Sequence, residues 1–262
     1  MKYAYHILLF MSLSIIGQDP IETHLVKETS LKADTFISAN TFGDYYYTYE
    51  NVLFKHTQQT KGIDVGYNNF QLGTITSVNT FNPLKINVFY KDFNTVIILD
   101  NRLTEIFKLD FNTISPYKNI THVSTGFDNT VWIFNQNTLQ LELFDYKTNT
   151  TRQTTMPISS PVLDIKSNYN NCWLLTENYI YVFNYFGSLT KKIKNKGYTS
   201  LAVSNENLVL KKENSLYYFE ANTEKVTSIN TSNLLINEFF VTNETLYIYG
   251  NEKLHEYQIK IN

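Results

Sequence analysis

Residues 128–151 read DNTVWIFNQNTLQLELFDYKTNTT, which is two short apolar segments, each followed by polar residues that favour turns. Neither segment is long enough for a helix with a buried face. Leu139, Leu141 and Leu143 alternate with polar residues, as expected for a strand that buries one side. The stretch therefore predicts a β-hairpin. Related stretches follow at residues 170–190 (NNCWLLTENYIYVFNYFGSLT), 205–225 (NENLVLKKENSLYYFEANTEK) and 243–260 (NETLYIYGNEKLHEYQIK).

The same pattern occurs six times along the chain. The first strand of each hairpin begins near residues 44, 86, 130, 171, 207 and 245, so that the copies are 42, 44, 41, 36 and 38 residues apart. A repeat of about forty residues is typical of the four-stranded blade of a propeller. Each hairpin is preceded by a segment of small and β-branched residues, such as TITSVN (74–79) and TSLAVS (199–204), which suits strands crowded around a central channel. A more polar segment follows five of them and suits an outer edge.

The chain ends before the sixth copy can supply its outer strand. The segment from His24 to Leu31 precedes the first inner strand and has no other partner. We expect it to complete the last blade and so close the ring; the alternative is a disordered tail. The sequence thus predicts an all-β fold: a single β-propeller of six four-stranded blades closed by an N-terminal strand. Trp132 and Trp173 occupy matching positions in neighbouring copies and should pack between blades. The most helix-like window, EIFKLDFNTI (105–114), fits a strand equally well.

The N-terminus has the layout of a secretory signal peptide. Lys2 precedes an apolar stretch from Ala4 to Ile16, which is too short to span a bilayer comfortably. We assign residues 1–17 to the signal peptide and 18–262 to the propeller, with an uncleaved membrane anchor as the alternative. No other segment is long and apolar enough to cross a membrane. The net charge of −2 gives no reason to expect nucleic acid as a partner, and the single Cys172 excludes an internal disulfide.

Motifs that carry chemistry are not found in the sequence. There is no nucleophile elbow, phosphate-binding glycine loop, calcium loop or paired metal-binding histidines, so we expect no catalytic residues, no metal and no small-molecule cofactor. His122 lies in an inner strand, and a structural role fits it better than a ligand role. The polar residues that recur where the third strand of a blade ends should cap turn amides: Asp100, Asn184, Asp145 and Glu220. A pair of glycosidase carboxylates brought together by the fold stays open.

One copy departs from the repeat. The insert NTFNPLK (79–85) separates its inner strand from its hairpin, and Pro83 stiffens the junction. This copy is either a blade with a longer loop or a specified contact surface. For the second case we assign the following partner-binding residues: Phe81, Pro83, Lys85, Phe93, Asn94 and Arg102.

The run NPLKINVFYKDFNTVIILDNRLTEI (82–106) resembles a segment of small exported propeller-like proteins of Bacteroidota, some of which accompany the type IX secretion translocon of the outer membrane. The stretch from Asp128 to Lys147 is also similar to the short repeats of bacterial sensor-type propellers, with Trp132 in the tryptophan position. The first resemblance implies a periplasmic accessory protein held at the membrane by protein partners. We therefore expect a non-enzymatic scaffold or adaptor in a cell-envelope complex. The alternative is an exported propeller enzyme or binding protein acting on glycans.

Overall fold

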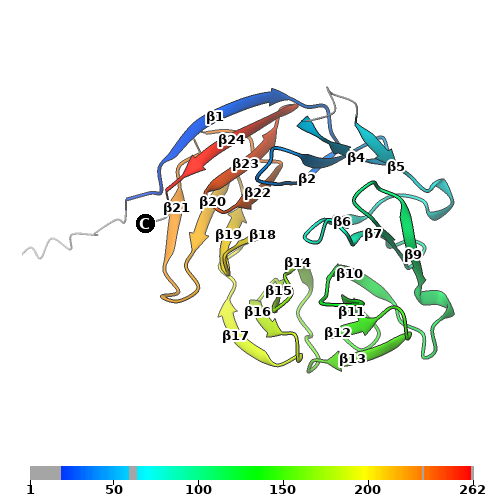
Figure 1. The fold of residues 1–262 in the computed structure, drawn as a ribbon. Helices are drawn as coiled ribbons and strands as arrows, with labels where there is room; N and C mark the ends of the chain where they lie inside the picture. Colours follow the sequence, from blue (N-terminus) through cyan, green and yellow to red (C-terminus); the bar gives the residue numbers. More distant parts are fainter. Residues whose placement is uncertain (1–18, 59–63, 232, 261–262) are drawn as a thin grey trace, which may run out of the picture.

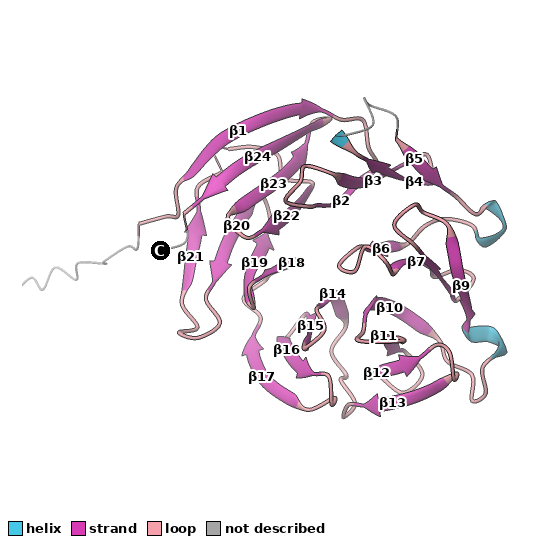
Figure 2. Ribbon diagram, viewed as in Figure 1, coloured by secondary structure: helices cyan, strands magenta, loops and turns pink. Residues whose placement is uncertain are grey.

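A computed structural model describes residues 19–58, 64–231 and 233–260, and the expected signal peptide lies outside these ranges. The described strands form six four-stranded antiparallel sheets arranged as blades around a central channel (Figure 1). The prediction of a six-bladed all-β propeller is confirmed. Helical structure in the described ranges is limited to short turns (Figure 2). The window EIFKLDFNTI is strand β9 (Glu105–Asp110) followed by the 3-10 turn Phe111–Thr113.

Each blade runs from an inner strand at the channel to an outer strand at the rim. Blade 1 contains β2 (Thr35–Ala39), β3 (Tyr45–Tyr49), β4 (Val52–His56) and β5 (Val65–Tyr67). Blade 2 contains β6 (Ser77–Asn79), β7 (Ile86–Tyr90), β8 (Thr95–Leu99) and β9. Blade 3 contains β10 (Ile120–Thr125), β11 (Thr130–Asn135), β12 (Gln140–Asp145) and β13 (Thr150–Thr154).

The second half of the chain repeats this order. Blade 4 contains β14 (Val162–Ser167), β15 (Asn171–Thr176), β16 (Tyr179–Asn184) and β17 (Leu189–Lys194). Blade 5 contains β18 (Ser200–Ser204), β19 (Asn207–Lys212), β20 (Ser215–Phe219) and β21 (Val226–Ile229). Blade 6 contains β22 (Glu238–Thr242), β23 (Thr245–Gly250), β24 (Lys253–Ile259) and, as its outer strand, β1 (Thr23–Ser30) from the N-terminus.

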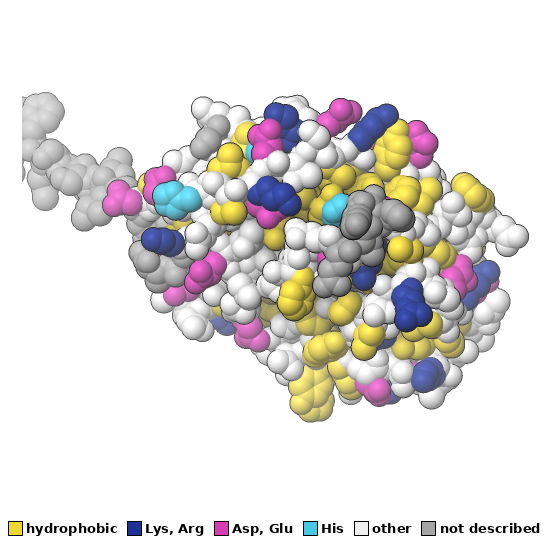
Figure 3. Space-filling model, turned by 45° about the horizontal axis from the view of Figure 1, so that its top comes forward, with side chains coloured by type: hydrophobic (Ala, Val, Ile, Leu, Met, Phe, Trp, Pro, Cys, Tyr) yellow, Lys and Arg dark blue, Asp and Glu magenta, His cyan; other side chains and the backbone are white. Residues whose placement is uncertain are grey.

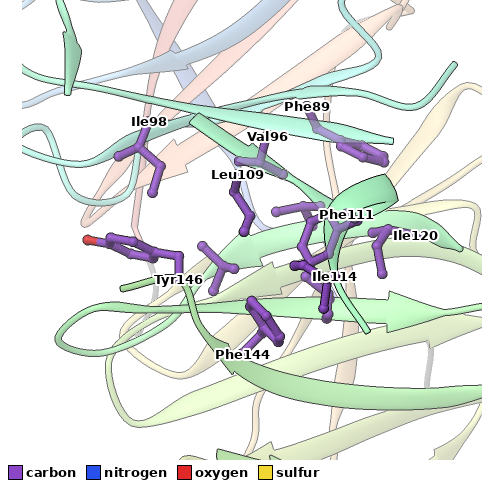
Figure 4. Packing of buried hydrophobic residues seen from close by; sticks show 12 residues of the cluster. Phe89, Val96, Ile98, Leu109, Phe111, Ile114, Ile120, Phe144 and Tyr146 are labelled. Atoms are coloured by element: carbon purple, nitrogen blue, oxygen red, sulfur yellow. The ribbon is translucent and has the colours of Figure 1, made fainter. Parts of the chain in front are cut away.

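The core is divided into six apolar clusters, and each lies between two neighbouring blades. Figure 4 shows the cluster between blades 2 and 3, where Val96 and Ile98 of β8 meet Phe144 of β12. The middle strands are buried on both sides for this reason, and every residue of β7, β8 and β11 is buried. A strand with two buried faces should read as a nearly continuous apolar run, as TVIIL does in β8.

The two tryptophans lie at equivalent positions, as the sequence predicted. Each is the third residue of the second strand of its blade, Trp132 in β11 and Trp173 in β15. Trp132 packs in the cluster between blades 3 and 4, and Trp173 packs in the cluster between blades 4 and 5. Cys172 is fully buried beside Leu174, and burial raises the pKa of its thiol well above the ordinary value.

The N-terminal strand closes the ring, which confirms the predicted role of residues 24–31. Strand β1 pairs antiparallel with β24 from Thr23 opposite Ile259 to Ser30 opposite Lys253. Most of its side chains are exposed, so that the backbone ladder and ion pairs such as Lys253–Glu28 (2.7 Å) hold it. Leu31, directly after the strand, is buried between blades 6 and 1.

Hairpin turns use Asn and Glu at positive φ where Gly is usual. Asn251 and Glu252 both have positive φ and form the turn between β23 and β24, as two-residue hairpins require. Gly250 precedes this turn as the last residue of β23. Glycine is required at position 250 because a Cβ there would lie 2.0 Å from the carbonyl oxygen of Leu235.

Truncation of either tryptophan should weaken the ring at a blade interface. We expect Trp132→Ala and Trp173→Ala each to lower the free energy of unfolding by about 3–5 kcal/mol, because each leaves a large cavity between two sheets. Urea unfolding followed by circular dichroism measures the change. An effect for one variant and none for the other would contradict their equivalence.

Candidate functional site

The antiparallel blades divide the loops between two faces of the disc. In each blade the turns from the first to the second strand and from the third to the fourth emerge on one side, which we name the loop face. The turns between the second and third strands emerge on the opposite side together with the connections between blades, and we name this side the connection face. In blade 2 the insert 80–85 therefore lies on the loop face, and the turn at 91–94 lies on the connection face.

The six predicted partner-binding residues do not form one surface. Phe81, Pro83 and Arg102 are exposed on the loop face, in the β6–β7 and β8–β9 turns. Phe93 is exposed on the connection face. Lys85 and Asn94 are buried, with exposed fractions of 6% and 5%, so neither side chain is accessible to a partner in this structure.

Lys85 joins blade 2 to blade 3. Its ammonium donates hydrogen bonds to the carbonyl oxygens of Gly126 (3.0 Å), Asp128 and Thr130 (3.4 Å) in the β10–β11 turn. Burial lowers the pKa of Lys85 to about 8, and the nearby charge of Asp128 opposes this shift only in part. The lysine fixes the base of the insert because it supplies donors to three carbonyl groups at once.

Asn94 makes a similar link on the connection face. Its side-chain amide donates to the carbonyl oxygen of Lys118 (2.6 Å) and accepts from the backbone amide of Ile120 (3.0 Å). It therefore ties the β7–β8 turn to the start of blade 3. The sequence suggested a contact role for a polar turn residue, but both polar atoms are occupied within the protein.

Two groups of contacting aromatic side chains lie on the loop face. Phe81 of blade 2 meets Tyr169 of blade 4 edge to face, with ring centroids 5.0 Å apart. Phe127 of blade 3 meets Tyr185 of blade 4 at 5.5 Å, and Tyr185 contacts Phe186 at 4.1 Å. We use "aromatic row" for these five residues. Phe81, Tyr169 and Phe186 are 45%, 46% and 59% exposed.

The positions of the row follow a recurrent feature of the sequence that no catalytic or binding motif describes. The turn after the inner strand carries an aromatic residue in each of the first four blades, at Phe42, Phe81, Phe127 and Tyr169, and Asn205 and Asn243 hold this place in the last two. Exposed aromatic groups at one place in successive blades gather on one face. Figure 3 shows exposed apolar side chains at several places on one side of the molecule.

Three of the four recurrent polar residues at the ends of third strands cap turn amides, as predicted, and Glu220 does not. The Asp100 carboxylate accepts from the backbone amides of Arg102 and Thr104, both at 2.9 Å. Asn184 does the same for Phe186 and Ser188. Asp145 accepts from two turn amides and also binds Arg152; these bonds lower its pKa although burial opposes them. The Glu220 carboxylate accepts from the hydroxyl of Thr223 instead.

The inner strands are joined around the channel by small polar side chains. Ser38 bonds to Thr80 (2.5 Å), Asn79 donates to Ser124 (3.0 Å), and Ser124 bonds to Ser167 (2.7 Å). These contacts connect blades 1 to 4 near the loop face. Small residues at these positions leave room for six strands around one axis, as the sequence suggested.

Ionisable side chains face the channel nearer the connection face. Asp164 and Lys166 of β14 and Glu238 of β22 line one cavity. Burial raises the pKa of Glu238, while the positive charges of Lys211 and Lys166 oppose the shift. His122 of β10 lies at a neighbouring cavity, bonds to its neighbour Thr121 (3.0 Å), and has its pKa lowered by burial. No sequence motif links Asp164 and Glu238, because they are distant in the chain and only the ring brings them to one cavity.

No group of three or more His, Cys, Asp or Glu that could hold a metal ion occurs among residues 19–58, 64–231 and 233–260. In the same ranges, no helix is long and apolar enough to cross a membrane. The arrangement offers two places for chemistry or recognition: the exposed aromatic row and the charged channel.

Comparison with known proteins identifies the fold alone. No protein-family model and no curated protein sequence matches the chain. Solved structures that resemble it include virginiamycin B lyase from Staphylococcus aureus, at 11% identity and a TM-score of 0.63, covering 91% of this chain and all of that one. A chain of the mitotic checkpoint complex gives 10% identity and 0.63, covering 99% and 100%. The Pan2 WD40 domain of Neurospora crassa gives 8% and 0.56, covering 94% and 98%.

The buried lysine should give stability a specific dependence on pH. Between about pH 8, the pKa of Lys85 in the folded protein, and about 10.4, the ordinary lysine pKa, the unfolded chain binds more protons than the folded one. Stability should therefore rise with pH through this window. We expect Lys85→Met to remove this rise, and the exposed Lys108→Met to retain it, in urea unfolding measured at several pH values. If the free energy of unfolding changed with pH equally in the wild type and in Lys85→Met, the lowered pKa of Lys85 would be contradicted.

Proposed function

We propose that this protein is an exported, non-enzymatic scaffold or adaptor of a cell-envelope complex. In the finer form of the proposal it is a periplasmic accessory subunit of the type IX secretion translocon at the outer membrane, in contact with other envelope proteins. The observation that carries the adaptor role is the aromatic row on the loop face. The type IX assignment rests on the resemblance of residues 82–106 to exported propeller-like proteins of Bacteroidota.

The aromatic row has the properties of a protein-binding centre. Tyr and Phe supply large contact areas with little conformational freedom to lose, and such residues are concentrated at the centres of interfaces. The row draws on three blades, so a partner would contact a rigid surface rather than a single loop. Arg152 lies over the ring of Phe127 at 5.6 Å and is bound to Asp145, which adds an ordered cation at the side of the row. A stable contact would cover roughly 800 Å² of each partner.

Paired substitutions on opposite faces test the proposal. Phe81 and Phe93 come from the same blade and are 45% and 47% exposed, but they lie on opposite faces. We expect Phe81→Ser combined with Tyr169→Ser to weaken binding of the envelope partner at least tenfold, while Phe93→Ser leaves it unchanged. Affinity purification of the tagged protein from native envelopes, followed by binding measurements on the recovered partner, provides the readout.

Several outcomes would contradict the proposal. If the Phe81 and Tyr169 variant retained its partner, or if Phe93→Ser lost it, the aromatic row would not be the docking centre. If the wild-type protein were recovered alone, the adaptor role would fail. A deletion strain tests the type IX assignment separately. If the strain secretes proteins as the wild type does while the rest of its envelope complex is intact, the type IX assignment is wrong, but the adaptor role is not contradicted.

The alternative, an enzyme or binding protein acting on glycans, has one specific observation in its favour. Asp164 and Glu238 come from different blades and line one cavity, and glycosidases use two carboxylates from about 5 to 10 Å apart. The cavity measures only about 180 Å³. An engineered cavity of about 150 Å³ holds benzene, so two sugar rings and the bond between them would extend beyond this cavity through its open side. The adaptor role is therefore preferred.

A glycan screen distinguishes the two functions. We expect the purified protein to release no reducing ends from a panel of envelope and plant polysaccharides at pH 5 to 8. Release that disappears in both Asp164→Asn and Glu238→Gln, with folding intact by circular dichroism, would support the alternative and overturn our preference.

A further inference from the structure

The cavity in the channel is built from the inner strands of five blades. Its walls include residues of β2, β14, β18 and β22 and the segment 75–78 at β6. Most of the lining is apolar or carries hydroxyl groups, as at Phe36, Thr76 and Ser200. The charged side chains in the lining are Asp164, Lys166 and Glu238. The Asp164 side chain is 16% exposed and that of Lys166 40% exposed, and a charge that is partly removed from water costs free energy unless it is paired.

Asp164 is fully partnered within the protein. One oxygen accepts from the ammonium of Lys166 (3.0 Å) and from the backbone amide of Ile165 (2.8 Å). The other accepts from the backbone amide of Leu201 in blade 5 (2.9 Å). Asp164 therefore holds Lys166 in the channel and links two blades. The Lys166 ammonium has three N–H donors, so this contact leaves donors free toward the cavity.

Glu238 is different. Its side chain is half-buried at the start of β22, and among the described residues it makes no hydrogen bond and no ion pair within 4 Å. The charges that act on it are Lys211 of β19 and Asp164 and Lys166 of β14. Lys211 donates to the carbonyl oxygen of Asn237 (2.9 Å) instead of to the carboxylate. A partly buried carboxylate that faces a cavity and has no donor within the protein is available to a ligand that donates hydrogen bonds, and burial raises its pKa while it stays unpaired.

We infer that the channel binds a small zwitterion of the size of a free amino acid, with its ammonium group on Glu238 and its carboxylate on Lys166. Two negative and two positive groups act on this space, so a ligand with a single charge would meet repulsion from one pair. A ligand with both charges can satisfy the carboxylate and the ammonium together. The volume of about 180 Å³, set against the benzene-binding cavity of about 150 Å³, suits roughly six to ten non-hydrogen atoms.

Calorimetric titration with defined probes tests this site. Glycine, L-alanine and L-serine represent the zwitterion, propylamine and propionate carry one charge each, and glucose is neutral. We expect at least one amino acid to bind at pH 7 with a dissociation constant below ~1 mM, and the single-charge probes and glucose to bind at least tenfold more weakly. Glu238→Gln should weaken amino-acid binding at least tenfold. The matched control is Glu244→Gln, which alters an exposed carboxylate in the next turn of the same blade and should leave binding unchanged.

The other results overturn the inference. Saturable binding of an amino acid that is equal in the wild type and Glu238→Gln would place the ligand elsewhere, and no binding by any amino acid would remove the site. Tighter binding of glucose than of the amino acids would favour a glycan role. Glu238→Gln keeps the side-chain volume and removes the enclosed charge, so it should fold, which circular dichroism checks. Partner recovery by this variant should be unchanged, so that failure of the channel site and failure of the adaptor role remain separate results.

Discussion

Packing between blades is the constraint on which this structure depends. A single four-stranded sheet of this protein is apolar on both faces and would be unstable alone in water. Each sheet is buried only because a neighbour covers each face, and the six apolar clusters correspond to the six interfaces. All six interfaces form only if the ring is closed, because an open ring would expose one apolar face of its first blade and one of its last blade. The pairing of β1 with β24 is therefore part of the core's stability although β1 itself is mostly exposed.

Polar contacts join the blades at places outside the six apolar clusters. At the channel, hydroxyl and amide groups of the inner strands, such as those of Ser124, Ser167 and Asn79, join one blade to the next. Between blades 2 and 3, Lys85 and Asn94 bind backbone groups of the following blade. Within blade 3 the buried Glu142 is satisfied by Lys118, Asn135 and Thr151 together, which lowers its pKa although burial opposes this. Lys85 and Glu142 thus link segments of the ring that are distant in sequence.

The sequence predicts features that depend on local pattern and fails for those that depend on neighbouring blades. Strand order, ring closure and the equivalence of Trp132 and Trp173 follow from the period and the alternation of side chains. The caps at Asp100 and Asn184 follow from their position at strand ends. Lys85 was assigned to a partner-binding surface, but the carbonyl groups of the next blade bind its ammonium and account for its burial. The contact of Phe81 with Tyr169 could not be predicted from the sequence, because it depends on how loops two blades apart are placed on the loop face.

The insert in blade 2 shows how a departure from the repeat can produce a rigid surface. The Asn79 side chain accepts from the amide of Phe81 (3.2 Å), and that of Asn82 accepts from the amide of Leu84 (3.0 Å). Pro83 fixes one backbone angle between them, and Lys85 anchors the end of the loop in blade 3. The exposed ring of Phe81 is thus held in place before any partner arrives, so less conformational freedom is lost on binding. These four constraints hold the exposed ring in one position, which is the property that the proposed docking surface requires.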